Sequence, residues 1–348
     1  MRFYTAQHQF YCGIDLHARS LYVCVMDQAG AILFHKNLPA NPDLFLNAIA
    51  PYRSDLVVAV ECIFTWYWIA DLCARQGITF VLGHALYMKA IHGGKTKNDK
   101  IDSQKIAALL RGGMLPMAYT YPQAMRSTRD LLRRRMYLVH QRSELLAHIQ
   151  NTNAQYNCRA FGKKIAYKSN RAGISEVFTD PMVQNSIEVD IQLIDTYATL
   201  IRNLELEILH NARKHDSLSL HLLRTIPGVG KILALVILYE IHDISRFPEV
   251  GNFISYCRLV KCQRESAGKK STSRNNKIGN VHLKWAFSEA ACLFLRGNEE
   301  AQRYQQKLVA KYGKSKALTL IAQKLARCAY SMLKRKEPFD LNRFFDNR

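Results

Sequence analysis

An uninterrupted apolar run near residue 60 sets the strongest limit on the fold. Residues 56–60 read Leu-Val-Val-Ala-Val, and Glu61 follows directly. A strand that is apolar on both faces is typical of the buried centre of a sheet. The run therefore predicts an α/β domain in which Glu61 stands at the end of a central strand.

Alternating strands and helices surround this run, and we expect residues 1–120 to form one domain. Three short apolar runs precede it and look like a meander. After it, a helix ends before Gly77, and a further strand and helix follow. The expected strands are Phe10–Asp15, Leu21–Met26, Ala31–Phe34, Leu56–Val60 and Ile78–Leu82. Three helices are expected: one begins at Asn41, a second ends near Gln76, and a third spans about Lys97 to Leu110.

Residues 121–218 carry few strand signals and two long apolar seams. Leucines recur at intervals of seven in the first seam, and the second has spacings of three and four, so each seam lies along one helix face. A basic insert, Arg159 to about Asp180, separates the two. The pattern predicts an antiparallel hairpin of long helices, a coiled-coil arm. The seams are Leu131, Leu138, Leu145 and Ile149, then Ile187, Ile191, Ile194, Ala198, Ile201, Leu204 and Ile208.

Residues 219–348 predict a third, mainly helical domain. Ile226-Pro-Gly-Val-Gly230 forms a tight turn before an apolar helix, Lys231 to about Ile241. A basic loop rich in Ser and Gly is expected from about Lys261 to Gly279. Further helices are expected at about Asn280–Leu295 and Ser315–Lys334.

The charge of the chain points to a polyanionic partner. Lys and Arg together number 49 against 28 Asp and Glu, a formal net charge of +21. Self-repulsion of this size opposes compactness, and nucleic acid is the leading partner because each neutralised phosphate releases counterions. An anionic membrane surface is less favoured, since the basic residues are not gathered on one amphipathic helix.

Cysteine spacing and the N-terminal sequence favour a cytoplasmic protein. Nine cysteines occur without a Cys-x-x-Cys pair, so neither a disulfide framework nor a zinc site is indicated. The N-terminus lacks an apolar signal core. The longest apolar run, Ile232–Tyr239, is far shorter than the roughly 20 residues that span a bilayer. We therefore expect no membrane partner.

Four acids form the first candidate site. Asp15 and Glu61 end two predicted strands, and Asp99 and Asp102 lie three apart on a predicted helix, so they share a helix face. Converging carboxylates suit two-metal phosphodiester chemistry, and oxygen ligands suit Mg²⁺. Each acid alone has a structural reading; Asp99, for example, could cap its helix. Their order matches a ribonuclease-H-like layout, with Lys97 and Lys100 placed to approach a phosphate.

A serine in a cationic loop forms the second candidate site. Ser266 lies among basic residues that could stabilise a pentacovalent phosphorane, and the small residues beside it would let the backbone approach a phosphate. On the residues alone, a solvated loop that grips DNA phosphate explains the pattern better, and Ser271 and Ser273 compete for any nucleophilic role. The basic residues of the loop are Arg264, Lys269, Lys270 and Arg274.

Two further segments are candidates for nucleic-acid binding. The stretch 123–141 contains a single acid, Asp130, and its arginines suit a nucleic-acid backbone, the alternative being a solvated helix face. The turn 226–230 would offer backbone N–H groups at a helix N-terminus, although a plain helix–helix connection explains it equally well. The residues are Arg126, Arg129, Arg133, Arg134 and Arg135 in the stretch, and Gly228, Gly230 and Lys231 in the turn.

Together these motifs resemble the DEDD transposases of the insertion-sequence "one-ten" family, the bridge-RNA-guided recombinases. The resemblance spans nearly the full chain, and the motifs appear in family order. They are Gly13-Ile-Asp15, Val60-Glu61, Lys97-Asn-Asp99-Lys-Ile-Asp102, Ile226-Pro-Gly-Val-Gly230, Tyr256-Cys-Arg-Leu259, Glu265-Ser266-Ala-Gly268 and the segment from Lys277 to Ala286. Family members commonly have Ala-Thr-Gly after the strand-end Glu and Gly after the serine, whereas this chain has Cys62-Ile-Phe-Thr and Ala267.

The resemblance implies a RuvC-like N-terminal domain, a coiled-coil arm and a C-terminal transposase domain with a catalytic serine, by position Ser266. It implies that this serine attacks DNA covalently while the four acids, supplied by another protomer, hold Mg²⁺ or Mn²⁺. The implied partners are donor and target double-stranded DNA, a structured non-coding guide RNA and further copies of the chain in a tetramer, a dimer of dimers. The implied location is the nucleoid of a bacterium or archaeon.

The residues leave two other functions open. A metal-dependent, structure-selective endonuclease, like a junction resolvase, would need the acids alone and would use water as nucleophile. A non-catalytic RNA- or DNA-binding protein would need only the charge of +21. The first would cut normally after Ser266→Ala, and the second would bind in a salt-sensitive manner without Mg²⁺.

Overall fold

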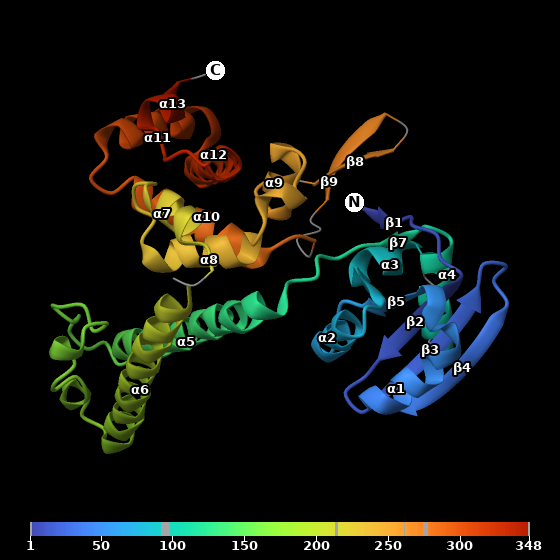
Figure 1. The fold of residues 1–348 in the computed structure, drawn as a ribbon. Helices are drawn as coiled ribbons and strands as arrows, with labels where there is room; N and C mark the ends of the chain where they lie inside the picture. Colours follow the sequence, from blue (N-terminus) through green and yellow to red (C-terminus); the bar gives the residue numbers. More distant parts are fainter. Residues whose placement is uncertain are drawn as a thin grey trace. The chain divides into compact units, whose positions relative to one another are not determined.

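A computed structural model describes residues 2–91, 98–212, 215–260, 262–266, 268–273 and 278–346. The chain divides into two compact units, Met1–Gln123 and Ala124–Arg348, which are drawn from blue to red along the sequence in Figure 1. The first boundary lies close to the expected one. The second unit contains both the expected arm and the expected C-terminal domain, so a boundary at 218 stays a prediction.

A five-stranded sheet forms the centre of the first unit, in the order β4-β3-β2-β5-β6. The first three strands along the chain pair antiparallel as the expected meander, and β5 and β6 run parallel to β2. The apolar run 56–60 is therefore an inner strand with neighbours on both sides. The bounds are β2 Phe10–Leu16, β3 Ser20–Asp27, β4 Ile32–Pro39, β5 Leu56–Glu61 and β6 Thr79–Gly83.

Helices cover both faces of this sheet. Helices α1 (Pro42–Ile49) and α2 (Tyr67–Arg75) pack on the face that carries Ile14 and Val60. Helix α4 (Asp99–Arg111) packs on the other face (Figure 1). At Gly13 the helix backbone comes so close that a Cβ would lie 2.2 Å from the Ala107 amide nitrogen. Glycine at this point brings α4 directly onto β2.

Three short elements of the first unit were not predicted from the sequence. Helix α3 spans Ala85–Ile91, and strands β1 (Phe3–Tyr4) and β7 (Leu115–Pro116) pair as a two-stranded sheet. Two-residue strands are too short to show a period, so hydropathy alone could not reveal them.

Two long helices begin the second unit, α5 (Gln123–Gln155) and α6 (Pro181–Ala212). Arg135 Nη2 lies 2.7 Å from Glu205 Oε1, and His148 Nδ1 lies 2.6 Å from Asp190 Oδ2. The partner number falls as the α5 number rises, so the helices run antiparallel, as expected. Coiled-coil packing along their length stays a prediction.

The remainder of the second unit is a set of helices around one apolar core. Helix α8 is buried along almost its whole length, and its bounds agree with the expected helix from Lys231. Helices α10 and α12 match the last two expected helices, and α7, α9, α11 and α13 were not predicted. The bounds are α7 Ser217–Arg224, α8 Lys231–Ile241, α9 Val250–Tyr256, α10 Val281–Phe294, α11 Glu299–Tyr312, α12 Lys314–Arg335 and α13 Leu341–Phe345.

The prediction of a loop at 261–279 is wrong in one respect, because the segment contains a β-hairpin. Strands β8 (Cys262–Ser266) and β9 (Lys269–Ser273) pair antiparallel within it. The many polar residues and the Gly hid the period-two pattern on which strand prediction depends. Within the described ranges, none of the helices is both long and apolar enough to cross a membrane.

Candidate metal centre and serine hairpin

The carboxyl ends of β2 and β5, at one edge of the sheet, place Asp15 and Glu61 next to each other. Ile14 pairs with Val60 in the parallel ladder of β2 and β5, and each acid is the next residue of its strand. Residues at the same level of parallel strands share a face, and here it is the face of Gly13, on which α4 packs. The two expected strand-end carboxylates therefore reach the rim that faces α4.

The first turn of α4 adds two more acids to that rim. Asn98 caps the helix, and its Oδ1 accepts a hydrogen bond from the Ile101 amide at 2.8 Å. Asp99 therefore is not the N-cap, and its carboxylate is not needed to hold the helix start. Asp102 lies one turn further, and its Oδ1 is 3.5 Å from Lys105 Nζ.

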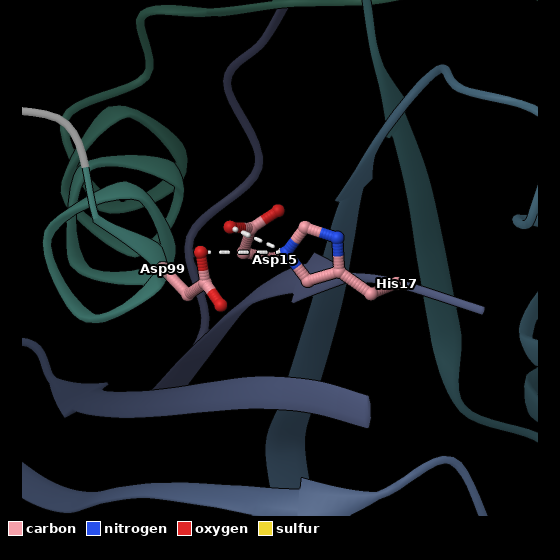
Figure 2. Close-up of side chains that lie close together, drawn as sticks. All are labelled: Asp15, His17 and Asp99. Atoms are coloured by element: carbon pink, nitrogen blue, oxygen red, sulfur yellow. Dashed lines mark ion pairs between the residues drawn. The ribbon is translucent and has the colours of Figure 1, made fainter. Parts of the chain in front are cut away.

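A histidine lies between two of these acids. His17 Nε2 is 3.4 Å from Asp15 Oδ2 and also 3.4 Å from Asp99 Oδ1 (Figure 2). One ligand atom from each of the three side chains lies within 4.8 Å of the others. We did not predict His17 from the sequence. Its position two residues after Asp15, directly after the end of β2, could have revealed it, because strand alternation continued by one residue places His17 on the face of Asp15.

The charges of this cluster are poorly neutralised. Burial raises the pKa of Asp15, the charge of nearby His17 lowers it, and the charges of Asp99 and Asp102 raise it again. The Asp15 side chain is 15% exposed and that of Asp99 is 52% exposed, so the cluster opens to solvent. Neighbouring carboxylates in an open site suit a divalent cation. The oxygen donors fit Mg²⁺, and with the imidazole nitrogen they also fit Mn²⁺.

The turn after Glu61 is held from two sides. The Cys62 amide donates to the Gly83 carbonyl at 2.8 Å, and Thr65 Oγ1 donates to the Leu16 carbonyl at 3.2 Å. These bonds join the turn to the ends of β6 and β2. Of the two lysines expected near phosphate, Lys100 is exposed on α4, and Lys97 lies outside the described residues.

The serine hairpin of the second unit places Ser266 at its tip. Ser266 pairs with Lys269, so it is the last strand residue before a two-residue turn. Gly268 in that turn has φ +74°, a conformation that glycine adopts without strain. Arg264 pairs with Ser271 and Glu265 with Lys270 on the strands below. Ala267 and Arg274 lie outside the described residues.

The Arg-rich stretch of α5 differs from the expectation. Arg126 and Arg129 are buried, so they present no surface to a phosphate in this chain. Arg135 donates from Nε to Glu205 Oε1 at 2.8 Å, across to α6. Burial therefore leaves neither arginine available for the expected contact with nucleic acid. They lie on the face of α5 that packs against the C-terminal helices, which the sequence periodicity did not distinguish.

Only one arginine of this stretch stands on the surface without a carboxylate contact among the described residues. Arg134 is exposed, and its guanidinium carbon lies 5.5 Å from the Tyr137 ring centroid. Arg133 is partly exposed but bonds to Glu240. Arg134 is thus the member of the stretch that best fits the expected phosphate contact.

The glycine turn before α8 combines a packing role with an open end. Gly228 has φ +83°, and a Cβ there would lie 2.7 Å from the Leu293 carbonyl carbon and from the Phe294 nitrogen. Close packing on α10 therefore explains this glycine. Gly230 has open space around it, and Lys231 is exposed at the start of α8, so these two stay candidates for phosphate contact.

Comparisons with known proteins agree with the order of these motifs. Residues 12–157, which include all four acids, match a family model described as "Transposase", of the DEDD type of IS110. Residues 220–306, which include the hairpin, match the "Transposase IS116/IS110/IS902 family". The chain belongs to the IS110 family of DEDD transposases. It is also 22% identical over 334 residues to the "Transposase for insertion sequence element IS1111A" of Coxiella burnetii, covering 94% of this chain and 90% of that protein.

Membership of this family makes the chain a DNA-processing enzyme. One family model covers the acids, and the other covers the serine hairpin.

Proposed function

We propose that this chain excises and inserts a mobile DNA element by RNA-guided strand exchange, with Ser266 as nucleophile and the four acids as a metal site. The observation that carries the proposal is the convergence of acids at the edge of the sheet. The contacts of Asp15 and Asp99 with His17, and the register of Glu61, support it. The strand order β4-β3-β2-β5-β6, with acids at the carboxyl ends, supports a RuvC-like fold for the first unit.

The acids Asp15, Glu61, Asp99 and Asp102 would hold Mg²⁺ or Mn²⁺ at this edge, with His17 beside them. A bound divalent ion supplies positive charge to a phosphoryl group and to its leaving oxygen. Ser266 Oγ attacks phosphorus, so that an Oγ–P bond forms and a phosphodiester P–O bond breaks. The serine proton is lost as the bond forms, and the departing strand oxygen takes up a proton. Basic side chains of the hairpin segment, Arg264, Lys269, Lys270 and Arg274 among them, balance the charge of the phosphorane.

The partners proposed here are donor and target double-stranded DNA, a structured non-coding guide RNA and further copies of the chain in a dimer of dimers. The charge of +21 supports a nucleic-acid partner. The serine and the acids belong to different units of the chain, so a tetramer could bring acids of one protomer to the serine of another. The chain would work at the nucleoid, with antiparallel α5 and α6 as a coiled-coil arm.

A denaturing gel tests this proposal. Protein, guide RNA and DNA are incubated with Mg²⁺, and a covalent protein–DNA band is sought. We expect a band that disappears with Ser266→Ala and remains with Ser271→Ala and Ser273→Ala, which are matched controls in the same hairpin. If Ser266→Ala cuts DNA normally while Asp15→Ala is inactive, water is the nucleophile and the chain is a metal-dependent endonuclease instead.

A further inference from the structure

A buried carboxylate lies in the most apolar helix of the second unit. Glu240 is in α8, among Leu238, Tyr239 and Ile241, and its side chain is only 3% exposed. An ionised group in such a place is expensive unless charged partners and hydrogen bonds compensate it. Its contacts therefore indicate what the position is for.

Three side chains from two other elements donate to this carboxylate. Arg129 Nε donates to Oε2 at 3.0 Å, Arg133 Nε to Oε1 at 2.7 Å and Arg133 Nη2 to Oε2 at 3.0 Å. Asn280 Nδ2 donates to Oε2 at 2.7 Å. Burial alone would raise the pKa of Glu240, but hydrogen bonds from Arg133 and Asn280 and the charges of both arginines lower it to about 2. The carboxylate is thus ionised and held at both oxygens.

Asn280 connects this carboxylate to the end of the hairpin segment. It is the N-cap of α10, where its Oδ1 accepts from the His282 amide at 2.9 Å and from the Leu283 amide at 3.0 Å. Its own amide donates to the Tyr256 carbonyl at 2.6 Å, at the end of α9. One asparagine therefore joins α8, α9 and α10.

Two residues with positive φ stand before and after the segment that carries the hairpin. Arg258, with φ +55°, precedes it, and Gly279, with φ +96°, follows it. A Cβ on Gly279 would lie 2.6 Å from the Tyr256 carbonyl oxygen and 3.0 Å from Arg258 Cγ. The two ends of the segment that carries the serine hairpin are therefore pressed together beside Asn280.

We propose that Glu240, acting through Asn280, is a positioning residue that fixes the base of the hairpin carrying Ser266. This inference rests on the proposed role of Ser266 as nucleophile. Packed apolar residues could join the helices equally well, since a buried ion pair is a poor source of stability. What the charged network adds is direction, because the arginines hold both oxygens of Glu240 and the bond from Asn280 to Oε2 then fixes the angle as well as the distance of Asn280.

The main test replaces Asn280 by another good helix cap. Asn280→Ser keeps an oxygen for the α10 amides but is too short to reach Glu240. The matched control is Asn298→Ser, which makes the same change at the N-cap of α11, where Asn298 accepts from the Ala301 amide at 3.0 Å. Both full-length variants are compared with wild type for melting temperature, DNA affinity and the rate of covalent adduct formation at saturating DNA.

A positioning role predicts a selective loss in Asn280→Ser. Its adduct should form about tenfold or more slowly, because small misplacement of a nucleophile has a large effect on rate. DNA affinity should stay within about twofold and melting within about 4 °C of wild type, and Asn298→Ser should match wild type throughout. Wild-type adduct rates in Asn280→Ser would overturn the inference.

Hydrogen exchange of the hairpin amides gives a readout that does not depend on the reaction. Peptides covering 262–273 should exchange faster than wild type in Asn280→Ser and at the wild-type rate in Asn298→Ser. If Asn280→Ser does not fold, Glu240→Gln is tested in its place, because glutamine keeps the shape of the side chain but loses the charge that holds Arg133. An unchanged adduct rate and unchanged hairpin exchange in Glu240→Gln would also overturn the inference. If wild type forms no Ser266-dependent adduct, the serine mechanism fails, while hydrogen exchange still decides whether Glu240 orders the hairpin.

Discussion

The acidic edge of the first unit and the Glu240 cluster of the second treat carboxylates in opposite ways. At the sheet edge, Asp15, Asp99 and Asp102 share a partly open site with His17. Burial is the largest effect that raises the pKa of Asp15, and the like charges of Asp99 and Asp102 raise it further. In the second unit, one buried carboxylate has two arginines and an asparagine. We propose that the first arrangement binds a divalent cation, whereas in the second the carboxylate is balanced by side chains of its own unit.

Removal of Glu240 should have the largest effect on stability. Glu240→Ala leaves buried Arg129 and partly exposed Arg133 without their carboxylate, and breaking a buried pair destabilises by about 3–5 kcal/mol. We expect a loss of that size in the free energy of unfolding by urea, when unfolding is monitored by hydrogen exchange of α8 peptides. Asp99→Ala should change the free energy of unfolding by less than about 0.5 kcal/mol. Equal effects of the two substitutions would remove the contrast between the sites.

Acid should weaken the second unit through the same carboxylate. The pKa of Glu240 falls from its ordinary 4.5 to about 2 in the folded protein, so its contribution is complete above about pH 4.5 and is lost as pH falls toward 2. The full contribution is on the order of 3 kcal/mol. We expect the stability difference between wild type and Glu240→Gln to shrink from pH 6 to pH 2.5. A difference independent of pH would contradict an ionised Glu240.

Substitution of His17 should weaken metal binding without harming the fold. His17→Ala removes the one nitrogen donor from the cluster that His17 forms with Asp15 and Asp99, and we expect Mn²⁺ affinity to fall about tenfold. Titration of the full chain with Mn²⁺, followed by electron paramagnetic resonance, measures the change. His140→Ala, on the exposed face of α5, is the control. Unchanged Mn²⁺ affinity would show that His17 is only a neighbour of the acids.

The smallest effect is expected at the surface of α5. Arg134→Ala should change stability by less than about 0.5 kcal/mol and should lower the slope of log affinity against log salt by about 0.9, the value for one lost phosphate contact. Arg133→Ala should instead destabilise the second unit, because Arg133 bonds to Glu240 twice. An identical salt slope in Arg134→Ala and wild type would exclude this phosphate contact.

Sequence patterns predicted the acidic edge better than they predicted the arginines. The strands that carry Asp15 and Glu61 are short, nearly continuous apolar runs, and parallel pairing then brings the acids together. The role of Arg129 could not be predicted in this way, because its partner Glu240 is 111 positions away and only the tertiary structure joins them. The hairpin at 262–273 escaped for another reason, since its strands are short and polar. His17 was within reach of the alternation rule and was missed.

Metal binding by the acidic edge tests the central claim most directly. The full chain is titrated with Mn²⁺, and free ion is followed by electron paramagnetic resonance for wild type, Asp15→Asn, Asp99→Asn and a control, Asp43→Asn, at an exposed acid of α1. We predict that wild type and Asp43→Asn bind Mn²⁺ alike, and that Asp15→Asn and Asp99→Asn each weaken binding by about tenfold or more. Equal Mn²⁺ affinity in all four proteins would contradict a metal site at this edge.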